Sequence, residues 1–205
     1  MHNEAGFRRL VNFNDAVVAI AITLLILPLV DSAGNIGAVG LGHFLTENRP
    51  KLLGFVLSFV VIGRFWWTQH IKFERLKSYD TVLVGGMFLW LFSIVFLPFP
   101  TELVGSAQVG GRAVHGLYIG TLLVTAIAGL IQQLAAIRQP ELQREEQRGS
   151  LTMDGDVVYV FLMAVALVVA VAAPLIGLWA LLVLVFQSPM VRLLARIRRA
   201  RTGSS

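Results

Sequence analysis

Apolar runs of bilayer-crossing length, with almost no charged residues, recur along this chain and constrain its fold more than any other feature. A transmembrane helix needs about 20 apolar residues, and suitable runs lie at about 13–30, 52–71, 82–99, 113–137, 157–173 and 175–191. Charged residues make up only 14% of the chain, against about 25% in a soluble domain. The runs are continuous and do not alternate, which excludes a transmembrane β-barrel. The sequence therefore predicts an all-α, polytopic membrane protein.

The distribution of basic residues decides the number of spans. Residues 157–186 carry no charge, and with Pro174 inside them they form either one long kinked helix or two short spans. With six spans and an inside N-terminus, the inside segments hold thirteen basic residues and the outside segments three. Five spans would place the arginine-rich C-terminus outside, against the positive-inside rule. We expect one six-helix transmembrane domain over residues 1–205, in the cell membrane, with both termini cytoplasmic.

Three segments each have two interpretations. The first run begins with basic residues, as a signal peptide does, but Asp15 and Pro28 fit a structural span better. The outer loop 32–42 is rich in glycine, which fits a flexible linker better than a re-entrant selectivity filter. The basic cluster 192–201 either anchors the topology or contacts anionic lipid headgroups. Because the basic residues lie at span ends, the net charge of +5 indicates topology and not nucleic-acid binding.

The first run carries an ordered line of large aliphatic side chains. Ile20, Leu24 and Leu27 are four and three residues apart, so on a helix Leu24 and Leu27 lie within about 40° of Ile20. A lipid-facing helix needs no such line, whereas a helix lining a narrow dry constriction does, and such constrictions gate channels. Asp31 falls on about the same face. It either rings the outer mouth of a pore and concentrates cations there or simply ends the span.

Ionisable side chains within apolar runs are candidates for function by default. Asp15 lies where the first run enters the membrane, and Arg64 and His70 lie in the second run. Together they suggest the relay of a proton-coupled secondary transporter, which is the alternative function. No clear internal repeat of the kind common in transporters is present. A non-conducting membrane scaffold is the third hypothesis.

The sequence does not predict an enzyme. The four histidines are scattered without metal-ligand spacing, and no Ser/His/Asp set or nucleotide-binding glycine motif is present. The chain has no cysteine, so disulfide and thiol chemistry are excluded. We expect no catalytic residue, no cofactor and no resident metal.

The beginning of the chain resembles a known family. Arg9-x-x-x-Phe13-Asn14-Asp15, followed by Ala-Val-Val-Ala-Ile-Ala-Ile-Thr-Leu-Leu, is similar to the Arg-x-x-x-Phe-Ser-Asp motif of the endosomal/lysosomal potassium channel family, in its short prokaryotic form. The supporting stretches are Phe65-Trp66-Trp67-Thr-Gln-His70-x-x-Phe73, Asp80, and Leu97-Pro98-Phe99-Pro100-Thr101. The match covers roughly the first hundred residues. It departs at Asn14, where the family usually has serine, and around Gly85-Gly86, where its usual asparagine is missing.

The resemblance implies a homotetramer of six-span subunits in membrane lipid, with the first helix lining a central pore. It makes Ile20 the narrowest apolar ring, Leu24 and Leu27 further rings, and Thr23 a hydroxyl layer implicated in selectivity. The residues that correspond to a network bracing the cytoplasmic end of the pore helix are Arg9, Phe13, Asn14, Asp15 and His70. We therefore expect a potassium-favouring cation channel with a hydrophobic constriction, with potassium as the permeant ion.

Overall fold

Nearly all of the described chain is helical. The computed structural model describes residues 4–35, 37, 40–106, 111–148 and 151–172. The helices are α1 (Glu4–Leu24), α2 (Leu27–Ser32), α4 (Leu41–Glu47), α5 (Arg49–Glu74), α6 (Thr81–Phe96), α7 (Pro98–Gly105), α8 (Arg112–Arg138) and α9 (Asp154–Ala172). Three short 3₁₀ turns lie at Ala33–Asn35, Pro140–Leu142 and Glu145–Gln147. The predicted sixth span, 175–191, lies outside the described residues.

Four helical segments are long and apolar enough to cross a membrane. They are Glu4–Ser32, Arg49–Glu74, Thr81–Gly105 and Arg112–Arg138, and each contains one of the first four predicted runs. The fifth predicted run coincides with α9, whose apolar part, Gly155–Val169, is shorter. The prediction of a helical, multi-pass membrane protein is therefore confirmed.

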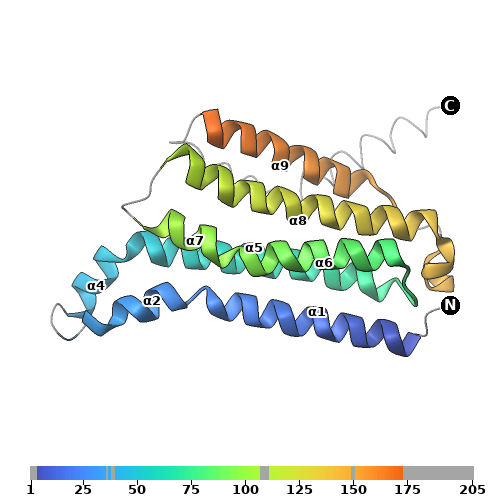
Figure 1. The fold of residues 1–205 in the computed structure, drawn as a ribbon, viewed down its shortest axis with the longest axis horizontal. Helices are drawn as coiled ribbons and strands as arrows, with labels where there is room; N and C mark the ends of the chain where they lie inside the picture. The colour runs from blue at the N-terminus through green and yellow to red at the C-terminus, as the bar shows by residue number, and fades with distance from the viewer. Residues whose placement is uncertain (1–3, 36, 38–39, 107–110, 149–150, 173–205) are drawn as a thin grey trace, which may run out of the picture.

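The long helices lie side by side in one elongated bundle. Figure 1 shows α1 along one edge, α5 and α6 in the middle, and α8 and α9 along the other edge. The main contacts join α6 to α8 and α8 to α9, while α1 packs on both α5 and α6. The core between α6 and α8 is filled by fully buried side chains, among them Met87, Trp90, Ile119 and Leu122.

Prolines break two of the spans. Pro28 has no N–H for the carbonyl of Leu24, four residues earlier, and a proline ring clashes with the carbonyl at that position. The helix α1 accordingly ends at Leu24, and α2 begins at Leu27. In the same way Pro98 and Pro100 separate α6 from α7. The sequence prediction of single runs over 13–30 and 82–99 missed both breaks.

The connections at the end of the bundle where α1 begins are held together by hydrogen bonds. Asp80 caps α6, because its Oδ1 accepts a hydrogen bond of 2.8 Å from the Leu83 amide. Its Oδ2 accepts another, of 2.9 Å, from the Gln139 side chain at the end of α8. An antiparallel bridge pairs Leu76 with Gln143 next to these contacts. The ends of α5, α6 and α8 are thus fixed relative to one another.

Candidate functional site

One face of α1 and α2 is left uncovered by the rest of the described chain. Ile20, Leu24 and Leu27 are 61%, 38% and 47% exposed. Thr23 and Asp31 are exposed as well. The residues of α1 that are buried against its neighbours are Phe7, Asn14, Val18 and Ala21. The aliphatic line read from the sequence is therefore a surface of the described part of the chain and not part of its core.

Two oxygen atoms next to the apolar side chains differ from them in polarity. The Thr23 hydroxyl donates a hydrogen bond of 2.8 Å to the Ile20 carbonyl, which leaves the lone pairs of the exposed hydroxyl oxygen available to a ligand. The carbonyl of Leu24 loses its usual helical donor, because Pro28 has no N–H. The exposed Thr23 hydroxyl is therefore able to contact a cation, and the Leu24 carbonyl lacks its usual helical partner.

Asp15 and His70, from α1 and α5, meet on the same tryptophan. The indole N–H of Trp66 donates a hydrogen bond of 2.9 Å to Oδ1 of Asp15. The Trp66 ring stacks on the His70 imidazole with ring centroids 5.3 Å apart. Nε2 of His70 lies 3.5 Å from a carboxylate oxygen of Glu74, one turn further along α5. Trp66, a position that the sequence analysis used only as part of the family resemblance, is thus the link between the two residues.

The other predicted members of this network lie apart from that link. The ring of Phe13 packs against Phe88 of α6, with centroids 6.3 Å apart. Arg9 is exposed, and in the described residues its guanidinium has no ion pair. Asn14 is 1% exposed, and neither polar atom of its amide has a hydrogen-bond partner there. The buried Nδ1 of His70 also has none in that part of the chain.

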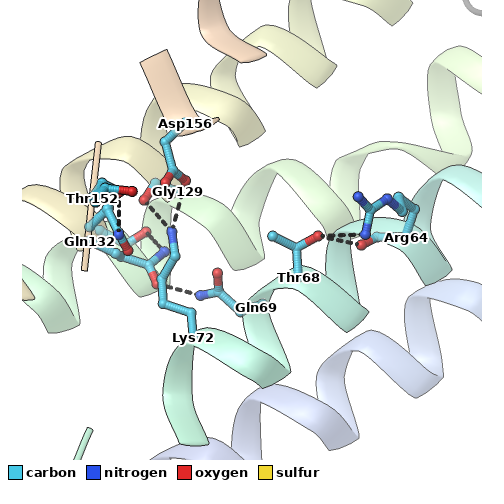
Figure 2. Close-up of polar contacts among 10 residues, drawn as sticks. Arg64, Thr68, Gln69, Lys72, Gly129, Gln132, Thr152 and Asp156 are labelled. Carbon is cyan, nitrogen blue, oxygen red and sulfur yellow. Dashed lines mark hydrogen bonds and ion pairs between the residues drawn. The ribbon is translucent and has the colours of Figure 1, made fainter. Parts of the chain in front are cut away.

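The residues of the transporter hypothesis are not arranged as one relay. Nη1 of Arg64 donates a hydrogen bond of 3.3 Å to the Thr68 hydroxyl on its own helix, as Figure 2 shows. Asp15 accepts from Trp66, and His70 faces Glu74. Asp15 and His70 thus share Trp66 as a partner, whereas the hydrogen bond of Arg64 to Thr68 stays within α5.

The structure reveals a polar cluster that the sequence analysis missed. Lys72 is one of the thirteen basic residues assigned to the inside segments, but it lies within α5 and is 7% exposed. Its Nζ donates a hydrogen bond of 2.8 Å to the Gly129 carbonyl of α8 and lies 3.1 Å from Oδ1 of Asp156 in α9. Figure 2 shows the side chain reaching between these two helices. One ammonium thus joins three helices.

Glutamines extend this cluster toward α6. The Gln69 amide donates to the side-chain carbonyl of Gln132, whose own amide donates a hydrogen bond of 3.1 Å to the Gly86 carbonyl. Gln133 donates one of 3.0 Å to the carbonyl of Thr152. The signal in the sequence was the presence of amide side chains in otherwise apolar runs, since polar side chains in membrane helices usually bond across helices.

Comparisons with known proteins agree with the resemblance found in the sequence. Residues 9–98 match the model of the family described as "Endosomal/lysosomal potassium channel TMEM175". A potassium channel of Streptomyces collinus is 36% identical over 133 residues, which are 64% of this chain and 63% of that protein. A potassium channel of a Chryseobacterium species is 32% identical over 135 residues, which are 63% of this chain and 65% of that protein. The match thus spans just under two thirds of the length of these curated relatives.

A solved structure shares the fold. It is the crystal structure of a lysosomal potassium-selective channel TMEM175 homologue from Chamaesiphon minutus, with a TM-score of 0.75 and 24% sequence identity. The match covers 91% of this chain and 98% of that one. The predicted resemblance to this family is therefore confirmed. The curated relatives are named as channels and not as enzymes or transporters, so the transporter alternative is not supported.

Proposed function

We infer that this chain, a relative of the endosomal/lysosomal potassium channel TMEM175 family through its residues 9–98, is the pore-forming subunit of a potassium-favouring cation channel. The observation that carries the proposal is the uncovered apolar face of α1 and α2 with Ile20, Leu24 and Leu27 on it. The opposite face of α1 is packed against α5 and α6. One face of α1 is thus held by its own subunit, and the other face is available to line a pore together with α1 of other subunits.

The proposed gate is a ring of Ile20 side chains, with Leu24 and Leu27 forming further rings. Several copies of such branched side chains around one axis leave a constriction too narrow and too apolar for a hydrated ion, and such constrictions close by expelling water. A small rotation or outward shift of α1 would admit water and the ion. The break between α1 and α2 at Pro28 supports this, because it lets the two segments move differently.

Selectivity in this proposal comes from oxygen atoms next to the constriction. The exposed Thr23 hydroxyl and the Leu24 carbonyl freed by Pro28 replace part of the hydration shell of a potassium ion. Asp31, exposed on α2, would form a ring of carboxylates at the outer mouth and raise the local cation concentration. No cofactor has a role in this mechanism, and potassium is the permeant ion.

We propose that the channel is a homotetramer of single six-span domains comprising residues 1–205, embedded in lipid of the cell membrane with both termini cytoplasmic. The excess of basic residues in the inside segments supports this orientation. The bond from Trp66 to Asp15 and the stacking of Trp66 on His70 would brace the cytoplasmic end of the pore helix. Arg9, Phe13 and Asn14 are the other members that the resemblance predicts, and in the described chain they lie apart from the Trp66 link.

The test is potassium flux into liposomes that contain the purified protein. We expect Ile20→Asn to wet the constriction and to raise the flux at least severalfold. Val168→Asn is the matched control, because Val168 is 67% exposed on α9, the helix at the far edge from α1 (Figure 1). An unchanged flux in Ile20→Asn, or an equal rise in both variants, would contradict the gate. Absence of flux in the wild-type protein would contradict the channel itself.

A further inference from the structure

A cavity of about 250 Å³ lies between α5, α7 and α8. Its walls are formed mainly by aliphatic side chains, among them Leu53, Leu57, Val104 and Ile119. The residues lining it come from these three helices and none from α1, so the cavity is separate from the proposed pore surface. Pockets that enclose drug-sized ligands have volumes of roughly 300–1,000 Å³, so this one suits a slender apolar group.

The floor of the cavity is a chain of three buried hydroxyl groups. Thr101 donates a hydrogen bond of 2.8 Å to the Leu97 carbonyl, so its single proton is committed. Ser58, 2.8 Å from the Thr101 oxygen, must therefore donate to it, and Tyr118, 3.0 Å from Ser58, must donate to Ser58. No hydroxyl proton remains for a ligand. An anionic group therefore gains nothing at the floor, and the inner end of the cavity favours an apolar chain.

The mouth of the cavity has the opposite character. Arg49 lies there at the first turn of α5 and is exposed, and among the described residues its guanidinium has no ion pair. A cation is unfavourable at a helix N-terminus, where an anion is favoured. The neighbouring Lys51 is already engaged, since its Nζ donates a hydrogen bond of 2.6 Å to Ser32. Within the described part of the chain, Arg49 is thus a cation at the mouth that lacks a counter-ion.

We propose that this cavity binds one acyl chain of an anionic membrane lipid, with the lipid phosphate at Arg49. From Arg49 to Ser58 the helix rises by roughly 13 Å, which sets the depth available to the chain between Leu53, Leu57 and Ile119. Half-buried His115 also lines the cavity, and its Nδ1 lies 3.0 Å from the Gly111 carbonyl. The proposal requires membrane insertion but does not depend on ion conduction.

The test measures lipid retention by native mass spectrometry of the full-length protein, released from nanodiscs that contain phosphatidylglycerol and phosphatidylcholine in equal amounts. We expect each wild-type subunit to retain one phosphatidylglycerol in preference to phosphatidylcholine. Arg49→Gln should reduce that preference roughly fivefold, since a basic residue near an anionic membrane surface contributes about 1 kcal/mol. Leu53→Trp, which fills the cavity and keeps the charge, should abolish retention of both lipids.

Two matched controls separate the site from general effects. Arg112→Gln removes an exposed cation at the start of α8 that does not line the cavity, and Val56→Trp adds the same ring to an exposed position of α5 outside it. Both should retain lipid as the wild type does. If Arg112→Gln and Arg49→Gln lose the preference for phosphatidylglycerol equally, the preference comes from surface charge in general. That result would overturn the proposal. Absence of retained lipid in the intact wild-type protein would also overturn it.

Discussion

Nζ of Lys72 lies 3.1 Å from Oδ1 of Asp156, so a single ion pair joins the end of α5 to the start of α9. Lys72 is 7% exposed and Asp156 is 24% exposed. The same ammonium donates to the Gly129 carbonyl of α8. A buried charge is tolerated only when close partners replace its lost hydration. The pair is therefore a condition for packing α9 on α8 at this end of the bundle.

Removing the charge of Asp156 should destabilise the protein more than removing the charge of Lys72. Asp156→Asn leaves a buried ammonium without its counter-ion and should cost roughly 2–4 kcal/mol. Lys72→Met leaves a partly hydrated carboxylate and should cost about half as much. The double variant should be no less stable than Asp156→Asn alone, since the two residues are coupled. Thermal unfolding in detergent measures these differences.

Lys77→Met is the control for this experiment. Its Nζ lies 3.8 Å from Glu145, and the two side chains are 36% and 79% exposed. Exposed pairs contribute about 0–1 kcal/mol, so this variant should unfold close to the wild-type temperature. If Lys77→Met and Asp156→Asn lose equal stability, then the buried ion pair of Lys72 contributes no more to the free energy of unfolding than the exposed pair does.

A second prediction concerns the close contact of α6 with α8 at Gly86. A Cβ atom added there would lie 2.9 Å from Cγ of Gln132 and 3.3 Å from Cγ2 of Ile131. Gln132 cannot move away freely, since it bonds both Gln69 and the Gly86 carbonyl. Gly86→Ala should therefore cost about 1–3 kcal/mol. Gly85→Ala, where a Cβ atom would meet nothing within 4 Å, should be neutral or slightly stabilising in the same unfolding measurement.

The first four spans could be predicted from the sequence because each one is a continuous apolar stretch of the chain. The run 52–71 lies within α5 (Arg49–Glu74), and 113–137 lies within α8 (Arg112–Arg138). Hydropathy alone did not predict the breaks, which depend on the missing N–H of Pro28 and of Pro98. Nor did it predict the burial of Lys72, because that depends on Asp156, a residue 84 positions away.

In the candidate site, too, features set by one helix could be predicted from the sequence, and features set by contacts between helices could not. Exposure of Ile20, Leu24 and Leu27 on one side follows from helical periodicity. The contact of Asp15 with His70 through Trp66 depends on how α1 packs against α5, which no spacing within one helix determines. Asn14 shows the same limit, since the sequence suggested a hydrogen-bonding member of the network but the fold buries its amide without a partner in the described chain.

The indole N–H of Trp66 should contribute measurably to the packing of α1. Trp66→Phe removes the donor to Asp15 and leaves a half-buried carboxylate short of one hydrogen bond, at a cost of about 1–3 kcal/mol. Trp67→Phe makes the same chemical change at a 51% exposed ring and should cost less than 1 kcal/mol. Similar unfolding temperatures for the two variants would show that the bond to Asp15 does not hold α1 in place.

The hydroxyl of Thr23 should affect ion preference and not stability. Thr23→Val keeps the shape of the side chain but removes the exposed oxygen, so in the proposed channel the potassium-over-sodium permeability ratio should fall about fivefold, the equivalent of one hydrogen bond of about 1 kcal/mol. Reversal potentials in bi-ionic recordings measure that ratio. The control is Thr68→Val on α5, where the threonine also bonds a backbone carbonyl of its own helix. An unchanged ratio in Thr23→Val would remove Thr23 from the selectivity layer.

The buried amide of Asn14 should lower the stability of the fold. Both of its polar atoms are buried without a hydrogen-bond partner in the described residues, and an unsatisfied buried polar group costs about 1–3 kcal/mol. Asn14→Leu, which keeps the number and branching of the side-chain heavy atoms, should therefore raise the unfolding temperature in detergent. Asn12→Leu, the same change at an exposed position of α1, should leave that temperature nearly unchanged. If Asn14→Leu instead lowers it, the buried amide is not a net cost to the fold, and this prediction is wrong.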